Sequence, residues 1–325
     1  MSGAQSAMRA EPEPLIVVVG CGVIGMTTAL RLRAAGHRVE VWTRDDPLET
    51  TSAAAGAIWY PFLAEPREAV LRWSAVTFRR LRAMVDDPRT GVRMTPVVEV
   101  FDHEQPDLWW ADAVPDVERL PRSEVPDGYR AAARATVPVC DVPVHLDWLQ
   151  AELRRARVPV RRREVGRLED VFAVADVAVN CAGMGARELC GDGDLRPVRG
   201  QVTVLDGGGL AAAWIDDTAQ RPRYLIPRAA TTVVGGTAQQ DDERAEVDAD
   251  DAARMLEDAL VAAPQLASAR VREQRVGMRP FRSSVRLERE AGPDGAVLVH
   301  NYGHGGSGYT VSWGCAEDVV ALLPG

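Results

Sequence analysis

Three glycines spaced as Gly-x-Gly-x-x-Gly, at positions 20, 22 and 25, are the clearest candidate for a chemical site. Gly20 allows a tight turn, Gly22 lets a pyrophosphate approach the backbone, and Gly25 lets a helix pack closely on a strand. The turn also contains Val23 and Ile24, and a helix that begins there would direct its positive end at phosphates. We predict that this turn binds a dinucleotide, with a glycine-rich turn that holds no ligand as the alternative.

The elements around this turn predict a strand–helix–strand unit. Residues 15–19 are consecutive apolar residues, a run typical of a strand buried on both faces. A helical apolar pattern follows and ends at Gly36, and residues 37–42 have the pattern of a second strand. An acidic residue at the end of that strand would bind ribose. Asp45 lies slightly beyond the position that this role needs, and Arg44 lies where a cation could bind phosphate. The motif alone therefore does not distinguish an NAD site from an FAD site.

Two further segments are rich in small and hydroxyl residues. Residues 50–61 read TTSAAAGAIWYP, and residues 300–310 read HNYGHGGSGYT before an apolar helix. Small side chains let a planar cofactor lie against the backbone, whereas close helix packing is the alternative for the first segment. A second glycine-rich turn at a helix N-terminus is a second site for an anion or a carbonyl. We therefore expect both ends of the chain to converge on one extended ligand.

The charged residues exclude several kinds of chemistry. All 38 basic residues among the 325 are arginine, against 47 acidic ones, and the net charge is −9. Without lysine the chain has no Schiff base, no pyridoxal-phosphate anchor and no Walker-type lysine, so arginine, amides or backbone must hold any anionic substrate group. The acidic balance argues against a nucleic-acid binder. The bias toward arginine, alanine, glycine and valine is typical of a GC-rich bacterial genome.

Cysteine and histidine spacing argues against metal sites and disulfides. The five cysteines are odd in number and form no CxxC pair, which favours a reducing compartment. His300 and His304 are four apart, but the glycines at 303–306 disfavour the helix that this spacing needs, so we expect no metal.

Residues 1–13 are expected to be a disordered lead-in, and no apolar run approaches the roughly 20 residues of a membrane span. We expect a cytoplasmic protein that binds no membrane, and leave a homodimer open.

Six segments of the chain resemble one family of enzymes. They read VVVGCGVIGMTTAL, TTSAAAGAIWYPF, VNCAGMGA, RGQ, GMRPFRSSVRLERE and HNYGHGGSGYT, in this order, from about residue 15 to residue 314. This combination is similar to the D-amino acid oxidase family of FAD enzymes. D-aspartate oxidases are its close sibling group, and glycine oxidases are more distant.

The resemblance implies that the cofactor is FAD and suggests which residues bind it. The turn at 20–25 would hold the pyrophosphate, and Arg44 with Asp45 would approach the adenosine half. The other expected contacts fall into three groups along the cofactor. They are Thr50, Thr51, Gly56 and Ala57 toward the flavin, Val165, Ala182 and Gly183 near the adenine, and Gly305, Gly306, Gly308, Tyr309 and Thr310 at the isoalloxazine edge, where Arg279 is also expected.

The resemblance also implies the catalytic residues Tyr224, Arg279 and Gly306. In the family an arginine binds the substrate carboxylate and a tyrosine hydroxyl supports it, and Arg279 and Tyr224 match those positions. A guanidinium suits a carboxylate because its fork makes two parallel hydrogen bonds, and Pro280 biases Arg279 to an extended geometry at a strand edge. Without the resemblance, Arg279 could be a solvated surface arginine and Tyr224 a core tyrosine, and these are the alternatives to a role in substrate binding.

Departures from the family pattern concern the substrate. A second active-site tyrosine of the animal enzymes falls here on Gln220, and the short, Gly/Ala-rich connection of residues 205–223 suggests a reduced lid. D-aspartate oxidases use an additional arginine where this chain has Ala238. With Ile58, Tyr60 and Met278 nearby, the pocket is expected to suit neutral D-amino acids, with acidic D-amino acids as the alternative.

We expect an α/β plus α+β fold, in which a Rossmann-like FAD-binding domain is interleaved with a substrate domain on a mixed or antiparallel sheet. The FAD domain would comprise 14–60, 145–200 and 285–325, and the substrate domain 61–144 and 201–284. Predicted elements include a helix at 146–155 and strands at 176–181, 201–205, 231–236 and 270–279.

The motifs supply no positioned general base, so we hypothesise direct hydride transfer from the substrate Cα to flavin N5, with catalysis mainly by orientation. Oxygen would then regenerate the flavin and give hydrogen peroxide, and the imino acid would hydrolyse to a keto acid and ammonia. An NAD-dependent dehydrogenase and a non-catalytic flavin-binding protein are the alternatives.

Overall fold

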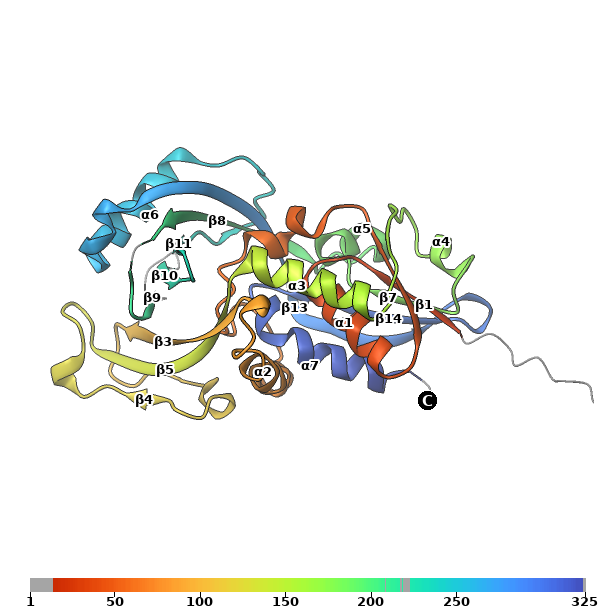
Figure 1. Ribbon diagram of the computed structural model, residues 1–325, viewed down its shortest axis with the longest axis horizontal. Coiled ribbons are helices and arrows are strands. Elements are labelled where there is room, and N and C mark those ends of the chain that lie inside the picture. Colours follow the sequence, from red (N-terminus) through yellow and green to blue (C-terminus); the bar gives the residue numbers. More distant parts are fainter. Residues whose placement is uncertain (1–13, 208, 217, 219–222, 324–325) are drawn as a thin grey trace, which may run out of the picture.

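The computed structural model describes residues 14–207, 209–216, 218 and 223–323. The lead-in predicted for residues 1–13, and Gln220, lie outside these residues. Within these residues, one sheet of 14 strands runs along the long axis of the molecule, and helices pack against both halves of it (Figure 1). The predicted mixed α/β fold is therefore confirmed.

The predicted strand–helix–strand unit forms the centre of one half of the molecule. It consists of β1 (Leu15–Val19), α1 (Val23–Ala34) and β2 (Arg38–Thr43). All five residues of β1 are buried, because β1 lies parallel between β2 and β7 (Val177–Asn180). The chain leaves α1 through Gly36, whose φ of +100° is unfavourable for other residues. The sheet extends through β6 (Val160–Arg162) beside β2 and β14 (Val297–His304) beside β7.

Helices cover this half of the sheet. Helix α1 packs against α3 (Val142–Arg155) and α7 (Gly308–Ala321), and α7 packs against α2 (Arg67–Arg82). The helix predicted at 146–155 begins four residues earlier, since Pro143 in its first turn has a backbone angle that suits a helix start. Two short helices, α4 (Glu169–Phe172) and α5 (Ala186–Cys190), lie before and after β7 in the chain.

The other half of the molecule is mostly antiparallel. The predicted strands at 201–205 and 231–236 are β8 (Arg196–Asp206) and β11 (Thr231–Gly235). The sheet continues through β10 (Arg223–Pro227), β9 (Ala213–Asp216), β3 (Val92–Phe101), β5 (Ala131–Cys140) and β4 (Glu118–Arg119), with a parallel pair only between β9 and β3 among these strands. The short β12 (Gln239–Gln240) pairs with β8, and α6 (Ala249–Ala262) packs against β8, β10 and β11.

The long strand β13 (Arg270–Ala291) joins the two halves. Its first part pairs with β8 and its last part with β14, so the predicted strand at 270–279 is the start of a 22-residue element. Because one sheet runs through the molecule, and α2 from the predicted substrate domain packs on α7 from the predicted FAD domain, the division into two interleaved domains stays a proposal.

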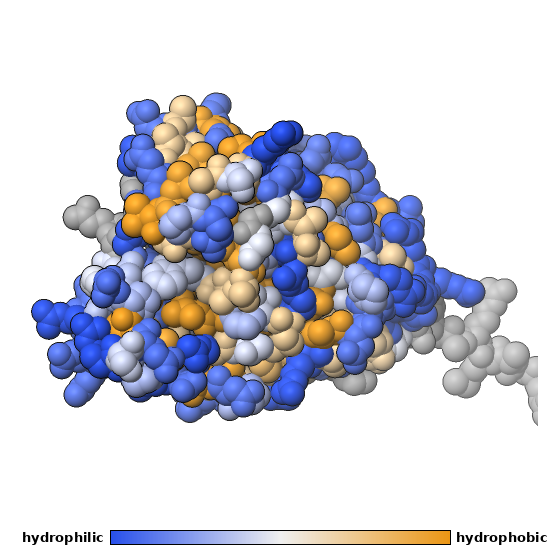
Figure 2. Space-filling view, turned by 60° about the vertical axis from the view of Figure 1, so that its left-hand side comes forward, coloured by the Kyte–Doolittle hydropathy of each residue, from blue (hydrophilic) through white to orange (hydrophobic). Residues whose placement is uncertain are grey.

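The face shown in Figure 2 is largely hydrophilic, with apolar side chains gathered in its upper left. Three exposed large apolar residues lie on α6 and at the start of β13: Leu260, Val261 and Val271, of which Val261 is 86% exposed. In the part of the chain that is described, no helix combines the length and the apolar character that crossing a membrane requires.

Candidate functional site

A cavity of about 560 Å³ lies between the β1–α1 turn and the carboxyl end of β14, and extends to β10 and β13. It brings together segments that are far apart in the sequence. The predicted cofactor and substrate residues that line it are Gly20, Gly22, Val23, Ile24, Arg44, Asp45, Thr50, Thr51, Gly56, Ala57, Val165, Ala182, Gly183, Tyr224, Arg279, Gly305, Gly306, Gly308 and Tyr309. Gly25 and Thr310 are not among its lining residues: Gly25 lies where α1 packs against the β1–α1 turn, and Thr310 forms hydrogen bonds with Tyr60.

The glycines of the β1–α1 turn leave no room for side chains. Gly20 has a φ of +109°, and a Cβ there would lie 2.4 Å from the Cys181 carbonyl oxygen. A Cβ on Gly25 would lie 2.0 Å from the Gly20 oxygen, so Gly25 allows the close contact of helix and strand. The Val23 N–H donates to Ser52 Oγ over 3.0 Å, which ties the helix start to the 50–57 segment. A bare backbone at the positive end of α1 fits the pyrophosphate of a dinucleotide.

Arg44 and Asp45 lie together at the end of the cavity expected to hold the adenosine. Asp45 accepts hydrogen bonds from Arg44 Nε and Nη2 at 3.0–3.2 Å, and this hydrogen bonding raises the pKa of Arg44. Arg44 and Asp45 are 65% and 38% exposed. Nearby, the Arg163 guanidinium lies 3.9 Å from the centre of the Trp42 ring. A ribose at Asp45 or a phosphate at Arg44 would therefore have to compete with an existing, exposed ion pair.

Three side chains donate hydrogen bonds to carbonyls of the 50–57 segment, and two of them, Arg228 and Tyr309, are buried. Arg275 Nη1 donates to Ala53 O over 2.7 Å, and Arg228 Nη2 donates to the carbonyls of Ala55 and Gly56 over 2.7 and 3.1 Å. Tyr309 donates to Ser52 O over 3.1 Å. Burial raises the pKa of Tyr309 well above its usual value, so its phenol keeps the proton, while burial lowers the pKa of Arg228. These donors fix the path of the segment along the cavity.

The second glycine-rich turn, expected at the isoalloxazine edge, packs on residues 62–63. A Cβ on Gly305, whose φ is +53°, would lie 1.8 Å from Leu63 O, and one on Gly306 would lie 2.6 Å from the Phe62 ring. The Gly306 N–H donates to Phe62 O over 3.0 Å. Helix α7 begins directly after this turn, with its N-terminus at the cavity.

Thr310 has a different place from the one expected. Its hydroxyl donates to the Tyr60 carbonyl over 3.0 Å and accepts from the Tyr60 N–H over 3.1 Å. Thr310 thus anchors the wall residue Tyr60, and the spacing of the glycines gave no sign of this contact.

Arg279 and Tyr224 lie at the cavity from neighbouring parts of the sheet. The Arg279 guanidinium lies over Gly200, where a Cβ would come within 2.4 Å of it, and Arg279 Nη1 donates to Thr237 O over 2.8 Å. The Tyr224 ring lies against Gly235 and Gly236, where a Cβ would come within 2.2 and 2.7 Å of ring or hydroxyl atoms. Both residues predicted to bind the substrate therefore line the same cavity. Ala238 does not line it.

The wall beside them is mainly apolar. Ile58, Met278 and Ile215 line it together with Tyr60. The Tyr60 hydroxyl donates to Glu99 Oε1 over 2.5 Å, and Glu99 is only 4% exposed. No motif indicated Glu99, since its place in the middle of β3 reads as one polar position of a strand.

His300 and His304 lie in strand β14 and have separate partners. His300 contacts Cys190 and Glu290, while His304 Nε2 lies 3.1 Å from Asn301 Oδ1. Burial lowers the pKa of His304 to about 3, so its ring is neutral at physiological pH. Within the described ranges, no group of three or more histidine, cysteine, aspartate or glutamate residues could hold a metal ion.

The chain belongs to the DAO family of FAD-dependent oxidoreductases, whose model matches residues 16–322. The expected family, fold class and cofactor are thereby confirmed, and the protein is a flavin-dependent oxidoreductase. Among proteins of known name, it is 44% identical to the D-amino-acid oxidase of Rubrobacter xylanophilus over 97% of both chains. It is 39% identical to that of Streptomyces coelicolor, over 94% of this chain and 96% of the other, and 30% identical to the D-aspartate oxidase of Homo sapiens, over 95% and 94%.

The fold is also similar to that of solved structures. The crystal structure of glycine oxidase from Geobacillus kaustophilus matches with a TM-score of 0.80 over 95% of this chain and 94% of that chain. The identity is 17%, so this likeness concerns the fold alone.

Proposed function

We propose that this protein oxidises D-amino acids to imino acids, which hydrolyse to keto acids and ammonia. The observation that carries the proposal is the meeting of Arg279 and Tyr224 on the cavity that the glycine-rich turns line. The relatives named D-amino-acid oxidase support it, since they match nearly the whole chain.

The residues at this end of the cavity suit an α-amino acid. The Arg279 guanidinium would bind the carboxylate with two hydrogen bonds, and the Tyr224 hydroxyl would support it. When bound, FAD supplies the acceptor for the hydride that leaves the substrate Cα. The protein would contribute orientation and the exclusion of water. His304 also lines the cavity, but burial lowers its pKa to about 3, so its ring is too weak a base to take a proton from the substrate near neutral pH.

We propose neutral D-amino acids as the preferred substrates. Ile58, Ile215 and Met278 offer an apolar wall to the substrate side chain. Arg223 also lines the cavity and would attract an acidic side chain, which keeps the acidic alternative open. Its guanidinium, however, forms an ion pair with Asp216, which is 1% exposed.

A peroxide assay with the FAD-loaded protein tests both parts of this proposal. We expect oxygen-dependent peroxide formation with D-alanine and D-phenylalanine, and little with D-aspartate, D-glutamate or glycine. A clear preference for D-aspartate would contradict the neutral preference while retaining the enzyme class. An absence of turnover with every D-amino acid would contradict the function itself.

We also propose that the protein works in the bacterial cytoplasm, with oxygen as its second substrate and hydrogen peroxide as a product. The support for the compartment is that all five cysteines are free, and Cys21, Cys140, Cys181 and Cys315 are buried. A homodimer remains a proposal that light scattering of the purified protein would test.

A further inference from the structure

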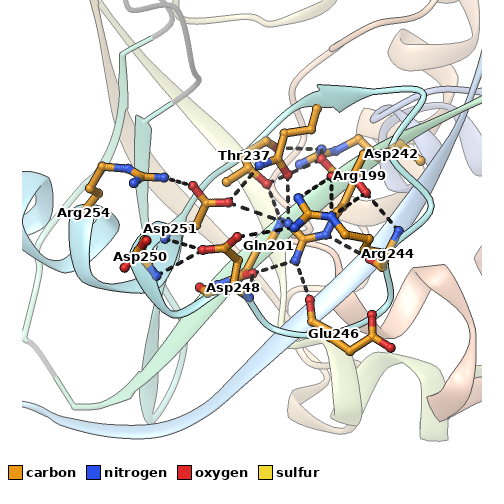
Figure 3. A network of polar contacts seen from close by, with 12 residues as sticks. Arg199, Gln201, Thr237, Asp242, Arg244, Glu246, Asp248, Asp250, Asp251 and Arg254 are labelled. Carbon is orange, nitrogen blue, oxygen red and sulfur yellow. Dashed lines mark hydrogen bonds and ion pairs between the residues drawn. The ribbon is translucent and has the colours of Figure 1, made fainter.

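Arg199 is a fully buried arginine whose side chain serves no part of the proposed chemistry directly. It lies on β8 with an exposed fraction of 0%. Its guanidinium donates to Arg244 O, Gln239 Oε1, Gln201 Oε1 and Glu246 O over 2.9, 2.8, 2.9 and 2.6 Å (Figure 3). The Asp251 carboxylate lies 3.8 Å from Nη1 and supplies a countercharge. Burial of a charge is costly unless it is paired and hydrogen-bonded in this way.

These bonds fasten the connection between β11 and α6 onto β8. Gln201, two residues along β8, accepts from the Asp248 N–H and donates to the Asp248 carbonyl, both over 2.8 Å (Figure 3). At the other end of the connection, the Gln201 N–H donates to Thr237 Oγ1 over 2.9 Å. Arg199 binds the middle of the same connection through Gln239, Arg244 and Glu246.

The fastened connection contains the atom that orients Arg279. Arg279 Nη1 donates to Thr237 O over 2.8 Å, and its guanidinium lies over Gly200, between the two anchoring residues of β8. The preceding residues, Gly235 and Gly236, form the surface against which the Tyr224 ring lies. Residues 235–237 therefore contact both residues of the proposed substrate site. Strand β8 binds them in turn, through the hydrogen bond from the Gln201 N–H to Thr237 Oγ1.

We propose that Arg199 is a positioning residue for substrate recognition, which acts through Gln201 and Thr237 on the orientation of Arg279. Arg199 does not line the cavity in which substrate and cofactor are proposed to bind. It instead fixes the Thr237 carbonyl, and so the direction in which Arg279 presents its remaining N–H groups. This inference rests on the proposed function, in which Arg279 binds the substrate carboxylate.

Two variants and a matched control test the proposal on the FAD-loaded protein. Arg199→Gln removes the guanidinium that binds the connection between β11 and α6. Thr237→Val removes the hydroxyl that accepts from the Gln201 N–H, at little change in volume. The control is Arg254→Gln, because Arg254 pairs with Asp251 on the outer side of the same network and is 46% exposed. The measurements are the KM and kcat for D-alanine, the Kd for FAD, and the Kd for the carboxylate probe benzoate from its effect on the flavin absorbance.

We expect both variants to raise the KM and the benzoate Kd about tenfold, with kcat changed less than about threefold and FAD binding unchanged. The control should resemble the parent in all four quantities. A parent-like benzoate Kd in either folded variant, or a loss of FAD binding in proportion to that of benzoate, would overturn the positioning role. If Arg199→Gln does not fold, Thr237→Val decides. A parent protein that binds benzoate but oxidises no D-amino acid would contradict the proposed function and leave the positioning test in force.

Discussion

Replacement of Arg279 by leucine should weaken substrate recognition far more than protein stability. Among the described residues, Arg279 donates hydrogen bonds only through Nη1, to the carbonyl of Thr237 and, more weakly, to that of Arg199. Its other N–H groups therefore remain for a carboxylate. Each hydrogen bond to a charged group contributes about 1.5–3 kcal/mol. Loss of a two-bond fork should therefore cost about 3–6 kcal/mol, which lowers kcat/KM for D-alanine roughly 10²- to 10⁴-fold at about 1.4 kcal/mol per tenfold.

Steady-state peroxide formation against D-alanine concentration measures this loss, and FAD titration shows whether the cofactor site is intact. Arg289→Leu is a matched control, since Arg289 lies exposed on the same strand and does not line the cavity. We expect the control to have parent-like kinetics and Arg279→Leu to retain FAD. Unchanged kcat/KM in Arg279→Leu would refute the assignment of this residue to the carboxylate.

Three further outcomes follow from the geometry. Tyr224→Phe keeps the ring against Gly235 and Gly236 and should raise the KM for D-alanine about tenfold with a parent-like melting temperature; an unchanged KM would exclude the hydroxyl from binding. Gly25→Ala places a methyl 2.0 Å from the Gly20 oxygen and should abolish FAD retention on purification and lower the melting temperature, whereas a yellow, equally stable variant would contradict the turn geometry. Burial lowers the pKa of His145 to about 4 and that of His304 to about 3, so the unfolded chain binds more protons than the folded one at pH values below about 6.5. The free energy of unfolding from urea titrations should therefore fall between pH 6.5 and 4, by up to about 1.4 kcal/mol per pH unit for each histidine, and flat stability over this range would argue against neutral burial.

Short, local motifs carried most of what the sequence predicted correctly. The glycine spacing and the apolar run before it predicted β1, α1 and β2, because the turn between them has few alternatives. The family resemblance also implied Arg279 and Tyr224 as substrate-binding residues, and both line one cavity although they are 55 positions apart in the sequence.

The supporting arginines could not be predicted in the same way. Arg199, Arg228 and Arg275 are three of 38 arginines, and an arginine in a sequence reads as a solvated charge unless its partners are known. Those partners include backbone carbonyls from other elements: Arg228 donates to the Ala55 carbonyl across 173 positions of the chain. Only the folded sheet brings such groups together. Tyr60 and Glu99 are a further case, since their contact joins the cavity wall to the middle of β3.

The most direct test of the central claim is anaerobic mixing of the FAD-loaded protein with D-alanine, followed by the flavin absorbance. We predict that the absorbance near 450 nm bleaches within about a second, the time that turnover numbers of roughly 1–10³ per second imply, and that the same concentration of L-alanine leaves it unchanged. A flavin that stays oxidised with D-alanine and with every other D-amino acid, or one that L-alanine bleaches equally fast, would contradict the account.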